Sequence, residues 1–316
     1  MNHFGDRVVF TSFGESHGKA IGGVIEGIRA GQPVSMPLII EQMHRRAGKD
    51  TVNNIGISAR ANGEKDEVEW LSGIMEKDGQ LLTTGTPIAF LIRNTDAKTE
   101  DYEWMKHHYR PGHADFTYQA KYGIRDYRGG GRSSARETAA RVVAGTVVRQ
   151  SLQEKGIYIN ASLVQVGEIT DRKQFDTLLH DVQTAGDSIG GVVECKVDGL
   201  PAGVGEPLFD KLQARLAYAM MSINGCKGFE YGTGFRDMNK RGSELYIQGN
   251  VPCAASGGIE GGISNGLTLT FRCAFKPASS IKRLYKGRHD CCIAIRAVPV
   301  VEAMTALVLA DYGLTD

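Results

Sequence analysis

A short sequence that begins with two glycines occurs once in each half of the chain. Gly22–Glu26 reads G-G-V-I-E and Gly190–Glu194 reads G-G-V-V-E, and each is followed by an Ala-Gly pair and then by a proline that is expected to begin a helix. Matches that recur in the same order along a chain indicate a structural repeat. We therefore predict two pseudo-repeats, about residues 1–155 and 156–316, which pack as one body with a pocket between them or at one end.

Strands and helices are expected at corresponding places in the two halves. The strand-like runs after Gly85 and Gly266 correspond, and so do the helix after Arg136 and the closing helix Pro299–Tyr312, with Pro299 in its first turn and Gly313 past its end. The helix after Arg136 is apolar on nearly every side, which predicts burial within a layer of the fold. Its apolar residues are Ala139, Ala140, Val142, Val143, Ala144, Val147 and Val148.

Three consecutive glycines, Gly129–Gly131, lead into this helix through R-S-S-A-R-E. A glycine loop at a helix start presents backbone N–H groups and the positive end of the helix dipole, and both favour a bound anion. Ser134 and Glu137 have the spacing of a capping box. Arg132 and Arg136 would not stabilise a helix start by themselves, so we predict that an anion binds there. A tight turn with solvated arginines is the alternative.

Other polar segments carry residues suited to proton transfer or anion binding. Gly14–Gly18 (G-E-S-H-G) presents His17 in a turn, and histidine titrates near neutrality. Arg110–Asp115 is a Pro-Gly turn with a histidine and an aspartate, Lys276–Ser280 offers a cation and two hydroxyls, and Lys286–Asp290 adds two further cations. Each segment alone could be a surface loop, but their recurrence favours a binding site. The glycine loop lacks the G-K-[ST] ending that a P-loop phosphotransferase requires.

The bulk composition limits the class of function. The chain has 37 Lys+Arg against 36 Asp+Glu, which argues against a general binder of nucleic acid or of anionic membranes. None of the six cysteines has C-x-x-C spacing, so no metal site is expected. No secretory signal is apparent and no apolar run is expected to reach the length of a membrane span, so we predict a cytoplasmic protein with reduced thiols.

Taken together, these motifs are those of a known enzyme family. The chain resembles the chorismate synthases over nearly its whole length, and the matches fall in the family's order. They are G-E-S-H-G at 14–18, R-P-G-H-A-D at 110–115, the K-Y-G…R-D-Y-R-G-G-G-R-S-S-A-R-E-T run at 121–138, M-S-I-N-G at 221–225, G-G-I-S-N-G at 261–266, K-P-A-S-S-I at 276–281, G-R-H-D at 287–290 and I-R-A-V-P at 295–299.

The resemblance implies a fold, an activity and partners. The implied fold is α+β, a β-α-β sandwich with internal duplication in which central helices lie between antiparallel sheets. The implied enzyme is a lyase of the shikimate pathway that converts 5-enolpyruvylshikimate 3-phosphate to chorismate and phosphate by a 1,4-anti elimination. Its cofactor is FMN in the reduced form (FMNH2), with no net redox change. The family is usually homotetrameric, and NADP serves as a source of reducing equivalents in some members.

The resemblance also implies roles for individual residues, carried over motif by motif. His17, His113 and Asp290 match the catalytic positions. Ser16, Arg45, Arg110 and Arg136 match substrate-binding positions. The flavin-contacting positions are matched by Arg132, Ser133, Ser134, Asn224, Gly225, Gly261, Lys276, Pro277, Ala278, Ser279, Ser280 and Arg288.

Three departures from the family pattern affect these expectations. Thr51 stands where an arginine is expected, Cys291 follows G-R-H-D in place of proline, and the segment between Ile281 and Lys286 is short. The altered loop around Thr51 makes a nicotinamide contact doubtful, so an external flavin reductant is expected. The alternative is a catalytically weakened paralogue of the same fold that binds a flavin or a phosphometabolite.

Overall fold

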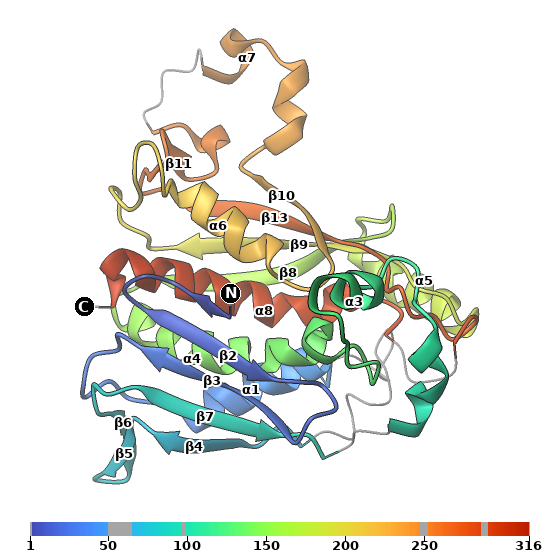
Figure 1. The fold of residues 1–316 in the computed structure, drawn as a ribbon. Coiled ribbons are helices and arrows are strands. Elements are labelled where there is room, and N and C mark those ends of the chain that lie inside the picture. Colours follow the sequence, from blue (N-terminus) through green and yellow to red (C-terminus); the bar gives the residue numbers. More distant parts are fainter. Residues whose placement is uncertain (1, 50–64, 96–98, 247–251, 286–289, 316) are drawn as a thin grey trace.

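Two antiparallel sheets lie on either side of a layer of helices (Figure 1). The computed structural model describes residues 2–49, 65–95, 99–246, 252–285 and 290–315. The first sheet has the order β1 (His3–Phe4), β2 (Val9–Gly14), β3 (Ala20–Glu26), β7 (Ile88–Arg93) and β4 (Val68–Ser72). The second has the order β10 (Cys226–Tyr231), β13 (Leu269–Phe275), β9 (Gly191–Asp198) and β8 (Tyr158–Val166).

The strands of each sheet alternate between buried and more exposed residues. In β7, Ile88, Phe90 and Ile92 are fully buried, while the residues between them are partly exposed. In β13, Leu269 and Phe271 are buried in the same alternation. Since side chains of a strand point to opposite faces in turn, one face of each sheet packs on the helices and the other faces outward. The α+β class expected from the resemblance is confirmed.

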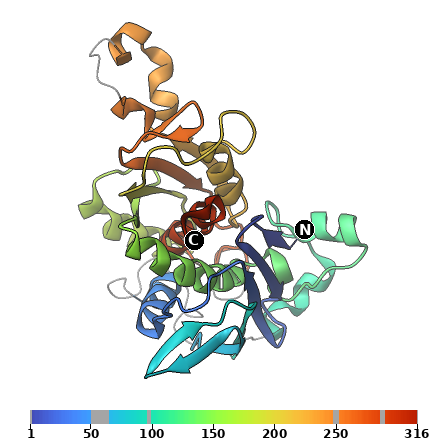
Figure 2. The same ribbon diagram turned by 90° about the vertical axis from the view of Figure 1, so that its left-hand side faces the viewer.

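The central layer is formed by α4 (Thr138–Glu154) and α8 (Ile293–Leu309), which pack along each other between the sheets (Figures 1 and 2). The helix α1 (Met36–Ala47) packs against both. The two central helices come very close at Gly145, where an added Cβ would lie 2.4 Å from Cα of Ala303. The predicted burial of the helix after Arg136 is therefore confirmed, and Gly145 is what permits the close crossing.

The two halves have corresponding topologies. In the first, β2, β3, β7 and β4 are neighbours in that order, and in the second the order is β8, β9, β13 and β10. A helix follows the second strand in each half, α1 in one and α6 (Leu212–Met221) in the other, and each half ends in a central helix. This correspondence agrees with the expected pseudo-repeats, while the duplication itself stays a prediction.

Both prolines expected to begin helices in the second half lie elsewhere. The helix α6 begins at Leu212, so Pro207 precedes it in a loop. The helix α8 begins at Ile293, and Pro299 lies inside it. A proline inside a helix removes one backbone donor, but the apolar residues around Pro299 are buried in the core, and this packing holds the helix in place.

The closing helix is also longer and more apolar than expected. Ile293–Leu314 is long and apolar enough to cross a membrane by length and composition, so the expectation that no run reaches that length is wrong. However, 78% of its most apolar window is buried inside the protein. That burial is typical of the core helix of a globular domain.

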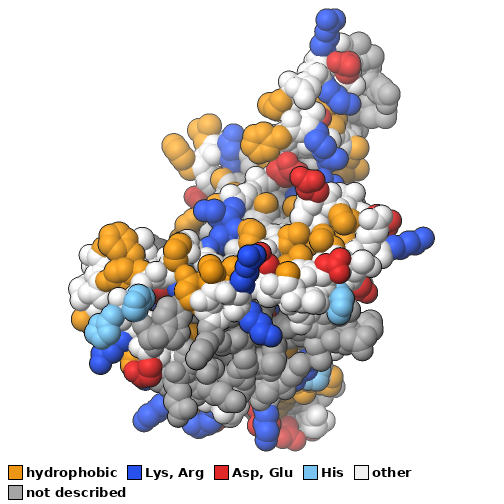
Figure 3. Space-filling view, turned by 90° about the vertical axis from the view of Figure 1, so that its right-hand side faces the viewer, with side chains coloured by type: hydrophobic (Ala, Val, Ile, Leu, Met, Phe, Trp, Pro, Cys, Tyr) orange, Lys and Arg blue, Asp and Glu red, His pale blue; other side chains and the backbone are white. Residues whose placement is uncertain are grey.

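The remaining elements lie at the periphery of the two sheets and the helix layer. Small hairpins are formed by β5 (Ile74–Lys77) with β6 (Gln80–Thr83) and by β11 (Ile259–Glu260) with β12 (Ile263–Ser264). The helices α3 (Asp115–Tyr122) and α5 (Phe175–Thr184) lie at one end of the molecule (Figure 1). A short helix, α7 (Gly242–Tyr246), projects away from the second sheet (Figure 1). Among the described residues on the face shown in Figure 3, Lys and Arg side chains lie interspersed with acidic and apolar ones.

Candidate active site

The three-glycine loop runs between two histidines. Gly129, Gly130 and Gly131 all have positive φ, at 62°, 90° and 56°, a conformation that side chains other than glycine rarely adopt. A Cβ added at Gly129 would lie 2.2 Å from Cε1 of His17, and one added at Gly130 would lie 2.7 Å from Cε1 of His113. Glycine is thus required at positions 129 and 130 both by the positive φ and by the lack of room for a side chain. The loop brings two histidines from distant segments against one stretch of backbone.

His17 is buried at the end of β2. Its Nδ1 lies 3.1 Å from Oγ of Ser16, and the ring of Tyr102 meets its ring edge-on at 4.9 Å between centroids. The turn is held by Asn94, whose Nδ2 donates to the carbonyl oxygens of Glu15 and Gly18 at 2.9 Å each. His17 is 7% exposed, so its orientation is fixed by packing from three sides.

His113 lies on the other side of the loop, in the turn before α3. Its Nδ1 is 2.8 Å from Oδ1 of Asp115 and 3.0 Å from Nη2 of Arg110. Arg110 in turn donates to both oxygens of Asp115 and, through Nη1, to Oγ of Ser280 at 2.9 Å. The guanidinium expected to bind substrate is therefore occupied mainly by an internal carboxylate.

The second half of the chain contacts the Arg110 turn directly. Lys276 follows β13, and its Nζ donates to the carbonyl oxygen of Gly112 and to Oγ of Ser279, both at 2.5 Å. Ser279 also donates to the Gly112 carbonyl at 2.8 Å. The Arg110 turn of one half is thus joined to the Lys276–Ser280 segment of the other by direct hydrogen bonds.

Asn224 connects the glycine loop to the end of α6. Its Nδ2 donates to the carbonyl oxygen of Ser133 at 2.9 Å, while its Oδ1 is buried and has no hydrogen-bond partner among the described residues. A buried amide oxygen without a donor is costly. The site therefore offers an acceptor for an N–H group of a ligand. A cavity of about 1250 Å³, lined by Gly130, Arg132, Ser133 and Asn224 among others, lies alongside.

Three further arginines of the prediction, which the structure describes, are also held by protein groups. Arg45 makes a bidentate ion pair with Glu302, at 2.6 Å and 3.1 Å. Arg136 pairs with Asp66, and its Nε donates to Oδ1 of Asn94 at 3.0 Å. Arg132 donates to the carbonyl oxygen of Gly14 at 3.1 Å and to Ser12. Each of these side chains is oriented from within the fold.

The local structure at the helix start differs from a capping box. Ser134 caps a short 3-10 turn (Ala135–Glu137), where its Oγ accepts from the backbone N–H of Arg136 at 3.3 Å. Glu137 instead pairs with Arg141, one turn further along α4, at 2.9 Å. The capping-box prediction is wrong because the 3-10 turn separates Ser134 from the first residue of α4 and because Arg141 offers Glu137 a charged partner.

Asp290 and Asn224 both line a small cavity of about 30 Å³, together with Arg46 and Arg296. Nη1 of Arg296 is 2.8 Å from Oδ2 of Asp290, and Nε of Arg296 donates to the carbonyl oxygen of Arg46 at 3.0 Å. Arg296 thus orients the predicted base, a role that its place in the sequence did not indicate.

Other predicted residues are less closely connected to the histidines. Gly225 carries the carbonyl that accepts from the backbone N–H of Lys276, and the carbonyl of Ala278 accepts from Ser188. Pro277 packs beside Gly190. Gly261 lies in the β11–β12 hairpin, at the opposite end of the second sheet from α3 (Figure 1). Arg288 and Thr51 lie outside the described residues.

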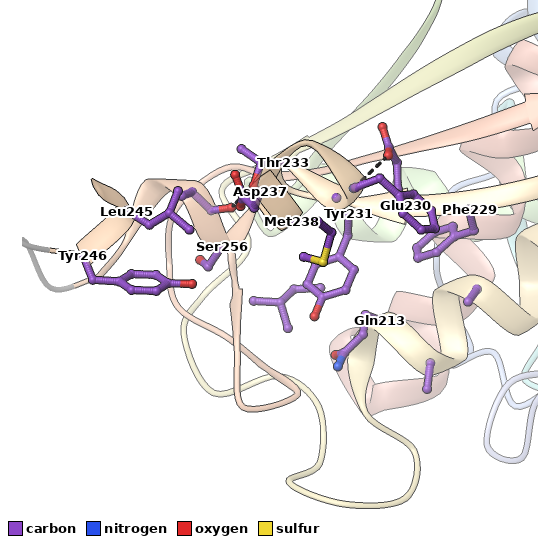
Figure 4. Close-up of a pocket in the computed structure, with 16 residues that line it drawn as sticks. Gln213, Phe229, Glu230, Tyr231, Thr233, Asp237, Met238, Leu245, Tyr246 and Ser256 are labelled. Atoms are coloured by element: carbon purple, nitrogen blue, oxygen red, sulfur yellow. Dashed lines mark hydrogen bonds between the residues drawn. The ribbon is translucent and has the colours of Figure 1, made fainter. Parts of the chain in front are cut away.

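A separate pocket of about 690 Å³ lies between α6 and the projecting α7 segment, and Figure 4 shows Gln213, Tyr231 and Met238 grouped around it. Its lining is largely aromatic and aliphatic. No residue predicted for catalysis or binding lines it, so we place the candidate active site at the glycine loop.

Comparison with known proteins settles the family. The family model of chorismate synthase matches residues 8–314 of the chain. The chain belongs to the chorismate synthase family. Membership makes the protein a carbon–oxygen lyase of aromatic biosynthesis, and the expected family and enzyme class are confirmed.

Individual relatives are similar over their whole length. The chorismate synthase of Christiangramia forsetii is 44% identical, with 100% of this chain and 98% of that protein covered. The chorismate synthase of Flavobacterium psychrophilum is 43% identical with the same coverage. A solved crystal structure of chorismate synthase matches with a TM-score of 0.75 and 31% identity, covering 98% of this chain and 92% of the other.

Proposed function

We propose that this protein converts 5-enolpyruvylshikimate 3-phosphate into chorismate and inorganic phosphate, in a 1,4-anti elimination that requires reduced FMN. The reaction breaks the C–O bond to the phosphate and a C–H bond of the ring, so it needs a proton donor for the leaving group and an acceptor for the ring proton. The observation that carries the proposal is the placement of His17 and His113 on either side of one glycine loop.

The residues beside the loop fit a flavin. The unpartnered Oδ1 of Asn224 can accept from a ring N–H, and glycine backbone leaves room for a flat ring to approach. Arg132, Ser133, Asn224 and Gly225, with Lys276 to Ser280 opposite, would hold the cofactor. Reduced FMN, when bound, supplies an electron-rich ring that assists the departure of the phosphate. His17, held by Ser16 and Tyr102, would keep a proton next to that ring.

His113 and Lys276 would serve the leaving phosphate. His113 would give it a proton, while Lys276 would hold its oxygens by charge. Burial, together with the nearby Lys227, lowers the pKa of Lys276. An anion beside Nζ would favour the charged form again, so the lysine and the phosphate would stabilise each other.

Asp290 would accept the ring proton, and Arg296 would orient its carboxylate through the 2.8 Å contact. Arg136 would bind one of the substrate's anionic groups and would then share its charge between that group and Asp66.

The decisive experiment is an anaerobic assay with chemically reduced FMN and 5-enolpyruvylshikimate 3-phosphate, following chorismate and phosphate together. We expect the two products in equal amounts. If FMN binds but neither product exceeds the background, the protein is instead a flavin-binding paralogue and the proposal fails.

The assembly, compartment and reductant expected from the resemblance are part of the same proposal. We propose a cytoplasmic homotetramer that relies on an external flavin reductant. Light scattering on the purified protein tests the assembly. NADPH oxidation by the purified protein without an added reductase would contradict the need for an external reductant.

A further inference from the structure

Asp115, the first residue of α3, contacts both Arg110 and His113. Its side chain is 2% exposed. Oδ2 accepts from the backbone N–H and from Nε of Arg110 at 3.0 Å and 2.9 Å, and Oδ1 accepts from Nη2 of Arg110 at 2.9 Å. Oδ1 also lies 2.8 Å from Nδ1 of His113, and Nη1 of Arg125 stands 4.0 Å away. A single buried carboxylate therefore contacts two groups of the candidate site.

This carboxylate is ionised under ordinary conditions. Burial alone would raise the pKa of Asp115, but hydrogen bonds from Arg110 and His113 outweigh the burial and hold that pKa well below its usual value of 3.8. An ionised carboxylate can only accept hydrogen bonds. A 2.8 Å contact with Nδ1 of His113 is favourable only if Nδ1 carries the hydrogen and donates it.

Nε2, the other ring nitrogen of His113, is then the one available for proton transfer. When one nitrogen of a histidine donates to a fixed partner, the tautomer is set and the second nitrogen is left for chemistry. Nε2 of His113 lies beside the glycine loop, 3.2 Å from the place that a Cβ on Gly130 would occupy. Nε2 is therefore the ring nitrogen that faces the glycine loop.

Asp115 also offsets the charge of Arg110. Nη2 of Arg110 lies 3.0 Å from Nδ1 of His113, so without a carboxylate a protonated imidazole would face a guanidinium directly. Asp115 lies against both groups and places a negative charge between them, so it holds the His113 ring and Arg110 in contact.

We propose that Asp115 is the positioning residue of His113: its carboxylate keeps hydrogen on Nδ1, fixes the ring against the glycine loop and leaves Nε2 as the nitrogen that gives up a proton. The inference rests on the proposed function, in which His113 protonates the leaving phosphate. Asp115 itself touches neither substrate nor cofactor in this scheme.

The first test needs no variant. Wild-type protein labelled with 15N-histidine is examined by NMR at pH 8, and His113→Asn assigns the His113 signals. We expect a hydrogen-bonded Nδ1–H and an Nε2 without hydrogen. The opposite tautomer, with hydrogen on Nε2 alone, would overturn the proposal even if the enzyme is active. If the enzyme makes no chorismate but the Nδ1–H is present, the proposed function fails and the positioning of the ring stands.

The second test is Asp115→Asn in the full chain. Loss of the carboxylate should lower kcat by about 100-fold or more, in the range that general acid catalysis contributes, while FMN affinity stays within about 3-fold. The Nδ1–H signal of His113 should weaken or shift in parallel. A variant that folds, binds FMN and keeps kcat within about 3-fold would contradict the proposal.

A matched control is Asp311→Asn. Asp311 is likewise a buried carboxylate, 5% exposed, which accepts from Nη2 of Arg215 at 2.5 Å and from the backbone N–H of Arg7 at 2.6 Å. It lies near the C-terminus, at the end of the molecule away from α3 (Figure 1). Its loss should lower thermal stability but leave kcat of the folded protein and the His113 signals unchanged. If Asp311→Asn lowers kcat as far as Asp115→Asn does, the effect is general destabilisation rather than positioning.

Discussion

Arg45 on α1 and Glu302 on α8 form a bidentate ion pair, and Arg149 on α4 shares the same carboxylate at 2.8 Å. Glu302 also accepts from the backbone N–H of Ala161 on β8, at 2.8 Å. One carboxylate thus joins three helices and a strand. Glu302 is 2% exposed, so water cannot replace it.

Glu302→Gln should therefore be strongly destabilising. Removing the charge leaves the buried Arg149 without its ion-pair partner, which typically costs about 3–5 kcal/mol. The free energy of unfolding is measured by urea denaturation. Glu69→Gln is the control, because its pair with Arg93 is largely exposed and should contribute less than about 1 kcal/mol. If the two variants lost equal amounts of unfolding free energy, burial would not explain the contribution of Glu302.

Gly129→Ala should abolish turnover. Gly129 has φ of 62°, and the new Cβ would collide with the ring of His17. Gly123→Ala is a matched control, since Gly123 has φ of 73° but open space around it. Both variants lose about 1–2 kcal/mol of stability from the left-handed backbone. Only Gly129→Ala should also lose activity and FMN binding, and a loss of activity in both would point to backbone strain alone.

Asn224→Leu should weaken FMN binding. The substitution removes the unpartnered Oδ1 and the bond to the carbonyl of Ser133. Loss of one buried hydrogen bond to a ligand corresponds to about 10-fold or more in the dissociation constant. Quenching of flavin fluorescence measures the affinity. An unchanged dissociation constant would show that the flavin binds elsewhere.

Asp66→Asn should change the acid sensitivity of the fold. Burial opposes ionisation of Asp66, but the charges of Arg136 and Arg46 outweigh it and lower the pKa below 3.8. A lowered folded-state pKa stabilises the protein above the unfolded value, and this contribution is lost as the pH falls below it. The stability difference between wild type and variant should thus be greatest above about pH 5 and shrink below pH 3.8.

The same series with Asp181→Asn gives the baseline, because Asp181 is exposed on α5. Urea unfolding is measured from about pH 3 to pH 7. A difference between wild type and Asp66→Asn that grows towards low pH would contradict the assignment.

The sequence predicted the parts of this protein that depend on local pattern. The glycine-led repeat anticipated the matching strand orders, and the apolar helix after Arg136 is buried as expected. The sequence could not predict which carboxylates hold the arginines, because Asp66 and Glu302 are far in sequence from Arg136 and Arg45. Long-range ion pairs leave no periodic signal. The start of α8 was missed because burial, which the sequence does not display, outweighs the local effect of Pro299.

The close crossing of Gly145 and Ala303 has a consequence for how the protein can come apart. Each central helix belongs to a different half, and their backbones touch where the two sequences would have to separate. If one half unfolded while the other stayed folded, the surface along which α4 and α8 pack would be exposed to solvent. The hydrogen bond from Lys276 to the carbonyl of Gly112 also joins the two halves, so we expect it to be lost together with the helix crossing when the protein unfolds.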